Sequence, residues 1–132
     1  MKVTVLKQFS IFMPNKPGAL SRLAGLFAEK KINILGIASE VRDDSGMVRI
    51  ALPSDSEVSS VLSQNGFSSV ETNILSVEVS DKAGELFRLT SALAEGRINI
   101  TTVYGTAFGH QVSLILIAVD NIEPAVKAME GA

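Results

Sequence analysis

The sequence predicts an α+β fold made of two copies of one unit, and three observations lead to that prediction. The segment 13–34 returns as the segment 79–100, at a constant offset of 66 positions. Both copies alternate extended and helical patterns in the same order. Two periods of this length account for all 132 residues. We therefore assign residues 1–66 to repeat 1 and residues 67–132 to repeat 2.

The two copies agree best along the first helix and the segment that follows it. The coinciding positions are Lys16/Lys82, Gly18/Gly84, Leu20/Leu86, Arg22/Arg88, Leu23/Leu89, Ala28/Ala94, Glu29/Glu95 and the Ile-Asn-Ile triplets at 32–34 and 98–100. A chain of this length can bury roughly two thirds of its unfolded surface, whereas half the chain alone would be marginal. We therefore expect the two repeats to fold together.

Repeat 1 is predicted to contain three strands and two helices. The strands are expected over 3–13, 32–41 and 47–52, the last two joined by a hairpin loop at 42–46. A turn at Pro17-Gly18 leads into a helix over 19–31, whose apolar face is formed by Leu20, Leu23, Ala24 and Phe27. Ser54 and Glu57 have capping-box spacing for a short second helix that ends at Asn65-Gly66.

Repeat 2 shows the same order of elements. Strands are expected over 67–79, 98–108 and 112–119, with a tight turn at 109–111. Leu86, Leu89 and Leu93 line the first helix. A final helix is expected to begin at a cap formed by Asp120 and Glu123 and to end near residue 130.

Each repeat so described is a βαββα unit, one strand short of the ferredoxin-like βαββαβ arrangement. Ser69–Asn73 can supply the missing strand of repeat 1, but repeat 2 has no chain left after its last helix. At the same offset, the lead-in Val3–Leu6 matches that segment. We predict that the terminal strands are exchanged, so that Val3–Leu6 completes the second antiparallel sheet in a pseudo-twofold pair.

Composition excludes several classes of function. The chain is 46% hydrophobic and 20% charged, with a net charge of −2 and no block of basic residues. No electrostatic footprint for nucleic acid or an anionic membrane is present. The N-terminal apolar run is too short for a signal peptide, and no run approaches the ~18 apolar residues that span a membrane. We therefore expect a cytoplasmic protein without nucleic-acid or membrane partners.

The sequence also argues against enzymatic chemistry. It contains no cysteine, and its single histidine, His110, has no second metal-ligating partner nearby. No Ser-His-Asp set can be assembled around it. Lys16 and Lys82 are predicted to be solvated because no glycine-rich phosphate loop accompanies them. An acylphosphatase-like site would need an arginine in the first turn. We expect no catalytic site, no metal and no cofactor.

The motifs resemble those of the ACT domain, a small regulatory module of amino-acid metabolism. The pattern N-x-P-G-x-L at 15–20, followed by A-E-x-x-I-N-I at 28–34, carries the resemblance, and its doubling resembles the stand-alone tandem ACT proteins. The resemblance covers essentially the whole sequence. It implies two ferredoxin-like repeats that bind an amino acid where two ACT domains meet and control a partner, such as a metabolic enzyme. It is compatible with a homodimer.

The resemblance also implies the ligand-binding positions. They are Asn15, Lys16, Pro17, Gly18, Ala19, Leu20, Asn33, Ile34 and Leu35 in repeat 1, and Asp81, Gly84, Asn99, Ile100 and Thr101 in repeat 2. The two asparagines of repeat 1 would hydrogen-bond the α-carboxylate and α-amino groups of the ligand. Physical chemistry supports this, because a helix N-terminus attracts a carboxylate and an amide both donates and accepts.

Structural explanations compete with these roles. Gly18 and Gly84 fit a strand-to-helix turn without any ligand. The amides of Asn33 and Asn99, expected to be partly buried, could bond the backbone instead. Asp81 would repel a carboxylate and is predicted to cap its helix, so we favour the site of repeat 1. A module that docks onto a partner protein without binding a ligand is the alternative function; an exposed edge strand or apolar patch would favour it.

Overall fold

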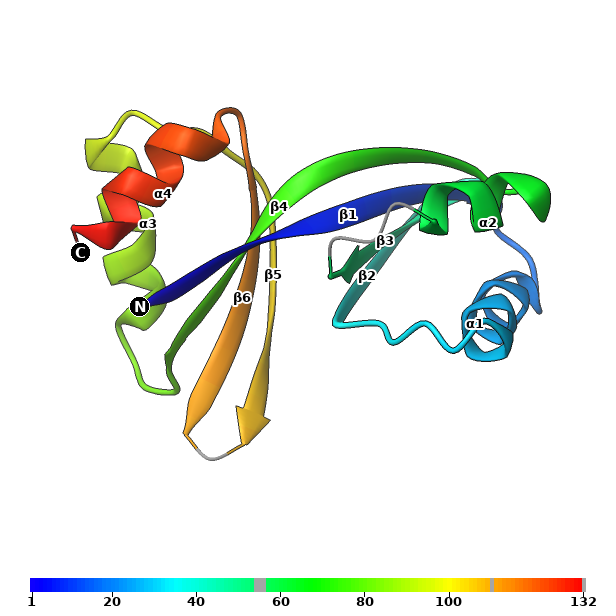
Figure 1. The fold of residues 1–132 in the computed structure, drawn as a ribbon, viewed down its shortest axis with the longest axis horizontal. Coiled ribbons are helices and arrows are strands. Elements are labelled where there is room, and N and C mark those ends of the chain that lie inside the picture. Colours follow the sequence, from blue (N-terminus) through cyan, green and yellow to red (C-terminus); the bar gives the residue numbers. More distant parts are fainter. Residues whose placement is uncertain (54–56, 110, 132) are drawn as a thin grey trace. The chain divides into compact units, whose positions relative to one another are not determined.

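The computed structural model of the chain describes residues 1–53, 57–109 and 111–131, without the side chains of 107–109. Its ten elements are drawn in Figure 1. None of the helices in these ranges is long and apolar enough to cross a membrane. In chain order the elements are β1 (Lys2–Pro14), α1 (Ala19–Glu29), β2 (Gly36–Arg42), β3 (Ser45–Leu52), α2 (Val58–Gln64), β4 (Ser68–Ser80), α3 (Glu85–Glu95), β5 (Ile100–Gly109), β6 (Val112–Val119) and α4 (Ile122–Glu130).

The chain divides into two compact units that exchange strands. The first unit is Lys7–Thr72, and the second combines Met1–Leu6 with Asn73–Ala132. The long strands β1 and β4 lie side by side (Figure 1), and each passes from one unit into the other. The predicted strand exchange is thereby confirmed. The boundary between residues 66 and 67 stays a prediction about the sequence repeat.

The first unit is a four-stranded antiparallel sheet with the strand order β2-β3-β1-β4. β3 pairs with β1 from Leu52↔Lys7 to Ser45↔Pro14, and it pairs with β2 on its other side. One face of the sheet packs against α1 and α2. The core of this unit consists of Phe9, Ile11, Leu23, Leu26, Phe27, Val48, Ile50, Leu52, Val58, Leu62 and Phe67.

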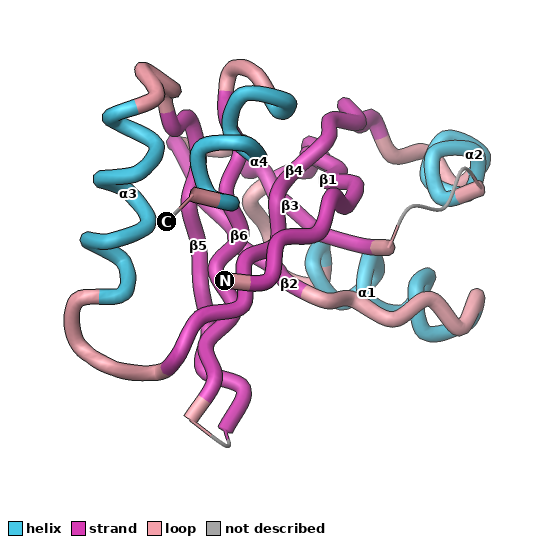
Figure 2. The backbone as a smooth tube through the Cα atoms, turned by 60° about the vertical axis from the view of Figure 1, so that its left-hand side comes forward, coloured by secondary structure: helices cyan, strands magenta, loops and turns pink. Residues whose placement is uncertain are grey.

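The second unit repeats this plan with the strand order β1-β4-β6-β5. Figure 2 shows α3 and α4 on the same side of its sheet. The two helices contact each other. The core consists of Leu75, Val77, Val79, Leu89, Leu93, Ile98, Ile117, Ala125 and Met129. Both units are therefore α+β with the ferredoxin-like order of elements.

The strand after the first helix begins later than predicted in each repeat. Lys31 and Arg97 have left-handed backbones, with φ of 57° and 58°, which turn the chain out of α1 and α3. The next residues fold back, so that the Ile32 N–H donates to the carbonyl of Phe27 at 2.9 Å. Ile32 then packs on the core instead of joining the sheet. The predicted strands over 32–41 and 98–108 are β2 and β5, which begin at residues 36 and 100.

The predicted apolar face of the first helix was partly wrong. Leu23, Leu26 and Phe27 are buried, but Leu20 is 46% exposed and Ala24 is also exposed. Leu20 lies in the first turn of α1, where the helix begins beside the edge of the sheet rather than over its middle. Leu86 is 52% exposed at the same place in α3. A helical period locates a face, but it does not tell how far the sheet extends beneath it.

Several predicted turn and cap residues have other roles. Arg42 pairs with Ser45, so the first hairpin turn contains only two residues, 43 and 44. Ser54 and His110 lie outside the described residues. α2 follows Glu57, whose side chain makes no capping bond. The carboxylate of Asp120 accepts a hydrogen bond from the Asn99 N–H at 3.3 Å and therefore does not cap α4.

Candidate functional site

The turn between β1 and α1 is held by backbone hydrogen bonds. The Asn15 N–H donates to the carbonyl of Asp44 at 3.0 Å, and the Lys16 N–H donates to that of Pro14 at 3.1 Å. Gly18 then takes a left-handed conformation, with φ of 88°, immediately before the helix. The turn is thus fastened to the β2–β3 hairpin, and the sequence provides glycine where a side chain would be strained.

The positive end of α1 is not neutralised by its own sequence. Among the described residues no side chain caps this helix, and its first turn contains no acidic residue. A Cβ placed on Gly18 would meet no atom within 4 Å, so the space beside the helix start is open. Free N–H groups and the helix dipole make such an end suitable for a carboxylate.

Asn15 stands at the entrance to this turn with its side chain exposed. Its Nδ2 donates a hydrogen bond to the backbone carbonyl of Asp43 at 3.0 Å. One amide hydrogen is used in this bond, which leaves the second hydrogen and the carbonyl oxygen for another partner. The amide is therefore oriented by the hairpin and retains both kinds of bonding capacity.

A cavity of about 170 Å³ lies beside the turn. Four predicted site residues line it, together with residues of β2 and β3. The lining residues are Met13, Pro14, Asn15, Lys16, Ala19, Leu20, Ser39, Glu40, Val41, Gly46, Met47 and Val48. A cavity of this size admits a small side chain or several water molecules.

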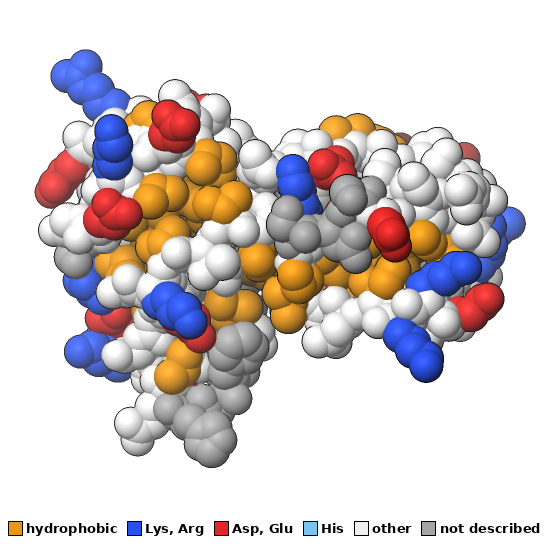
Figure 3. Space-filling view, in the orientation of Figure 1, with side chains coloured by type: hydrophobic (Ala, Val, Ile, Leu, Met, Phe, Trp, Pro, Cys, Tyr) orange, Lys and Arg blue, Asp and Glu red, His pale blue; other side chains and the backbone are white. Residues whose placement is uncertain are grey.

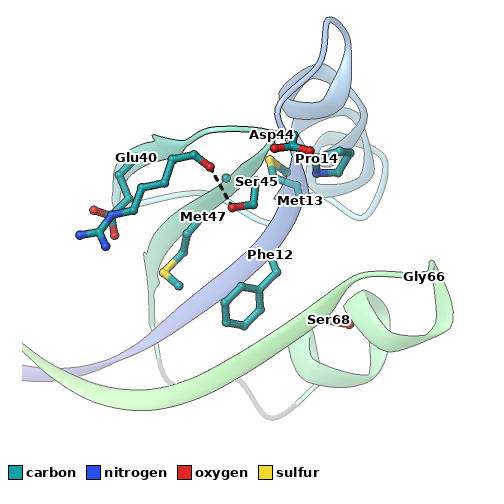
Figure 4. A pocket seen from close by; sticks show the side chains of 11 residues that line it. Phe12, Met13, Pro14, Glu40, Asp44, Ser45, Met47, Gly66 and Ser68 are labelled. Atoms are coloured by element: carbon teal, nitrogen blue, oxygen red, sulfur yellow. Dashed lines mark hydrogen bonds between the residues drawn. The ribbon is translucent and has the colours of Figure 1, made fainter.

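A second cavity, of about 660 Å³, lies on the other face of the same hairpin (Figure 4). Phe12 and Met47 are direct neighbours across β1 and β3, and their sequence neighbours Ile11 and Val48 are buried in the core. Since side chains alternate along a strand, Phe12 and Met47 point away from the helices. In Figure 4 their side chains lie close together in this cavity. The hydroxyl of Ser45 donates to the Arg42 carbonyl at 3.0 Å, drawn there as a dashed line.

Glu40 lines both cavities and carries a negative charge. Its Oε1 lies 2.7 Å from Nη1 of Arg49. This hydrogen bond, and the charge of Arg49, lower the pKa of the Glu40 carboxyl. Sequence reasoning did not select Glu40, because an acidic residue on an exposed strand gives no signal of its own. Only the pairing of β2 with β3 shows that it lies close to the turn at Asn15.

The remaining predicted residues of repeat 1 lie elsewhere in the first unit. Pro17 and Gly18 are exposed in the turn, but they do not line the cavity of 170 Å³. Asn33 lies in the connection between α1 and β2 and is exposed, so its predicted partial burial is wrong. Ile34 packs on the core, and the Leu35 N–H donates to the carbonyl of Ala51 at 3.0 Å. The late start of β2 explains this placement.

The predicted residues of repeat 2 lie in the second unit. Asp81 Oδ1 accepts a hydrogen bond from the Ser113 hydroxyl at 3.1 Å, and no described side chain caps α3. Asp81 is therefore not a helix cap. Asn99 is exposed, contrary to its predicted partial burial. Ile100 packs against the core of this unit, and the Thr101 hydroxyl donates to the carbonyl of Ala118 at 3.2 Å.

Comparison with known families gave a match to one domain. The family model of the ACT domain matches residues 7–64. This range begins at the first residue of the first unit and ends at the last residue of α2. A comparison with curated proteins gave no match. In the described ranges no group of three acidic or histidine side chains is placed to hold a metal ion.

Solved structures share the fold of the whole chain. A protein of Bacteroides thetaiotaomicron superposes with a TM-score of 0.89 at 22% identity, covering 98% of this chain and 89% of its own. The ligand-free regulatory subunit of aspartate kinase from Thermus thermophilus gives a TM-score of 0.74 at 17% identity, covering 100% and 97%. The corresponding subunit from Thermus flavus gives 0.66 at 16%, covering 99% and 96%. These likenesses show the tandem α+β fold.

Proposed function

We propose that this protein is a regulatory protein that binds an amino acid. The proposal starts from the match of residues 7–64 to the family model of the ACT domain. The observation that supports it best is the cavity beside Asn15, next to the uncapped positive end of α1. The likeness to regulatory subunits of aspartate kinase supports a partner of the same kind, an enzyme of amino-acid metabolism. We assign no catalytic step to the chain.

The site has groups that complement a zwitterion. The amide groups at the start of α1 would receive the α-carboxylate. The side-chain oxygen of Asn15 would receive the α-ammonium, since it is a hydrogen-bond acceptor. A small side chain would then occupy the cavity, between Ala19 and Val41.

All the residues that line this cavity belong to the first unit. A ligand there would stabilise one conformation of the chain. It could regulate a partner only to the extent that it binds one conformation more tightly than another. The free-energy coupling would be reciprocal, so the partner would also change the affinity for the amino acid.

A thermal-shift screen against the twenty amino acids tests this function. A ligand at about 1,000 times its dissociation constant stabilises the folded state by about 4 kcal/mol. We expect at least one amino acid to raise the melting temperature of the wild type and to have no effect on Asn15→Ala. The matched control is Asn65→Ala, which also removes an exposed amide bond to a backbone carbonyl, of 2.8 Å, but lies outside the cavity. Equal responses in both variants, or none in the wild type, would contradict the proposal.

A second candidate function, docking onto another protein copy, is favoured by one observation. β2 is an edge strand of its sheet, and three apolar side chains near it are 46% to 57% exposed: Leu20, Ile37 and Val41. Figure 3 shows hydrophobic side chains at the surface of this unit. If two copies paired antiparallel about Ser39, Ile37 of each copy would face Val41 of the other. An unpaired apolar edge is a template for such pairing.

Sedimentation over a range of concentrations tests this alternative. We expect Ile37→Lys to abolish association because it places a charge at the centre of the contact. Val103→Lys is the matched control, since Val103 occupies the same position of the repeat in the second unit and is 50% exposed. A wild type that remains monomeric at all concentrations would rule the pairing out.

A further inference from the structure

We infer that Glu85 acts as an internal anion at the start of α3, so that the chain binds one amino acid, through α1. This inference rests on the proposed function and deepens it. It adds the number of ligands per chain and names a residue that the sequence motifs did not select. Equivalent positions of the two repeats differ by 66 in residue number.

The backbones at the two helix starts are nearly the same. Gly18 and Gly84 have φ of 88° and 95°, and ψ of −12° and −13°. The N–H of the fourth helical residue, an arginine in each unit, donates to the glycine carbonyl at 2.9 Å. The N–H of Lys16 and that of Lys82 donate to the equivalent carbonyls at 3.1 and 3.0 Å. Differences in binding must therefore come from side chains.

Those side chains differ most at the first helical residue. Ala19 lines the cavity of the first unit, and α1 has no acidic residue in its first turn. Its counterpart Glu85 begins α3, and its side chain is only 11% exposed. The carboxylate accepts a hydrogen bond from Nη2 of Arg88 at 2.8 Å. That bond lowers the pKa of Glu85, which is therefore ionised at neutral pH.

The arginines at equivalent positions of the two helices have different partners. Arg22 of α1 lies over the ring of Phe67, 4.3 Å from its centre, and donates to the carbonyl of Asn65 at 2.5 Å. Arg22 thus connects α1 to the segment between α2 and β4. Arg88 instead binds the carboxylate of its own helix. The same residue type at the same position thus orients an anion in only one unit.

The consequence is electrostatic. The start of α3 carries two carboxylates of its own, Asp81 and Glu85, where the start of α1 has Asn15 and Ala19. A carboxylate in the first turn already interacts with the positive end of the helix. A ligand carboxylate would meet like charges there and would find the helix end satisfied. Of the two helix starts compared, both within the described residues, only that of α1 has no acidic residue in its first turn.

Exchanging the side chains tests the inference. Asp81→Asn/Glu85→Ala gives the start of α3 the two neutral residues found at the start of α1. We would screen the wild type, Asn15→Ala, Asn15→Ala/Asp81→Asn and Asn15→Ala/Asp81→Asn/Glu85→Ala by thermal shift, using the twenty amino acids at about 10 mM as probes. For any probe that responds, isothermal titration of the wild type and Asp81→Asn/Glu85→Ala then counts the ligands bound.

We expect the wild type to bind one ligand per chain and Asp81→Asn/Glu85→Ala to bind two. Binding lost in Asn15→Ala should return in the triple variant, but not in Asn15→Ala/Asp81→Asn. The inference would be overturned if the wild type bound two ligands. It would also be overturned if Asn15→Ala/Asp81→Asn regained binding, or if the triple variant did not. If no amino acid raised the melting temperature of the wild type but one raised that of the triple variant, the proposed function alone would be contradicted. If no amino acid raised the melting temperature of any of the four proteins, both the proposed function and the inference would be overturned.

Loss of the ion pair between Glu85 and Arg88 could also unfold α3. A second variant distinguishes this structural effect from the effect of the charge on binding. Glu85→Gln keeps the size of the side chain and removes its charge. Glu85→Gln is combined with Asn15→Ala/Asp81→Asn, the same background in which Glu85→Ala is screened. Circular dichroism and thermal melting confirm folding of each variant before binding is measured. A folded Glu85→Gln protein in this background that binds nothing would overturn the electrostatic argument.

Discussion

Gly18 and Gly84 have left-handed backbone conformations, which glycine adopts without strain. Both have strongly positive φ, and a Cβ added to either would meet no atom within 4 Å. An alanine would therefore suffer only backbone strain. We expect Gly18→Ala to destabilise the protein by about 1–2 kcal/mol, the cost of a left-handed conformation. Denaturant unfolding measures this difference.

Gly25 provides the control for that experiment. It lies within α1, its φ is not positive, and it also has open space around its Cα. Gly25→Ala is expected to stabilise the helix by roughly 0.5–1 kcal/mol, because glycine loses more backbone entropy on folding than alanine. If both substitutions destabilised the protein equally, backbone conformation could not explain the effect at Gly18.

Glu40 and Arg49 give the protein a defined acid response. The lowered pKa of Glu40 means that its ion pair contributes stability above the ordinary glutamate pKa of about 4.3. That contribution is lost as the pH falls through the lowered pKa of the folded state. We expect Arg49→Met to raise the pKa of Glu40 towards its ordinary value, as followed by carbon NMR of the carboxyl group.

The control for this titration is Arg42→Met. Arg42 also lowers the pKa of Glu40, but by a weaker charge interaction and without a hydrogen bond. The shift it causes should be smaller than that of Arg49→Met. The stability difference between the wild type and Arg49→Met should vanish below the lowered pKa. A difference that persisted in strong acid would show that the ion pair is not its source.

Among the elements, α1 separates residues that support the core from residues left for binding. Leu23 is fully buried, whereas Leu20 of the same helix is 46% exposed. We expect Leu23→Ala to cost about 2–5 kcal/mol of unfolding free energy. Leu20→Ala should change it by less than ~0.5 kcal/mol. Chemical denaturation of the two variants compares them, and a costly Leu20→Ala would place that side chain in the core after all.

The sequence predicted the order of elements well and their edges less well. Hydrophobic alternation and the internal repeat located the strands and helices of the described residues, because both signals depend on local chain geometry. The start of β2 was missed since Lys31 adopts a left-handed conformation that its residue type does not announce. The error was carried over to Asn33, whose predicted burial assumed a strand there.

Only the part of the candidate site that lies within one short segment could be predicted from the sequence. Asn15 and Ala19 could be chosen from the turn motif, since one short segment contains them. Glu40 and Phe12 could not, because strand pairing brings them to the hairpin. Glu85 was missed although it lies one position after a selected glycine. A charged residue at the start of a helix is so common that only its burial distinguishes it.

At the scale of the whole molecule, the exchanged strands make the second unit depend on the first six residues. Val3 packs against the core of that unit, and Lys2 lies 3.6 Å from Glu78 of β4. We expect deletion of residues 1–6 to expose β4 and to reduce hydrogen-exchange protection in β5, β6, α3 and α4. Protection in Lys7–Thr72 should fall much less. Uniform protection in the truncated protein would refute the dependence.

The exchanged strands also have a consequence for how the chain is made. Met1–Leu6 are synthesised well before Asn73–Ala132, with which they form the second unit. The second unit therefore cannot close until those later residues have emerged, whereas the first has all its strands once Thr72 has emerged. Contacts between such distant segments form slowly. Until then Met1–Leu6 has no partner within its own unit, and a chaperone that shields this segment would shorten the period in which it can aggregate.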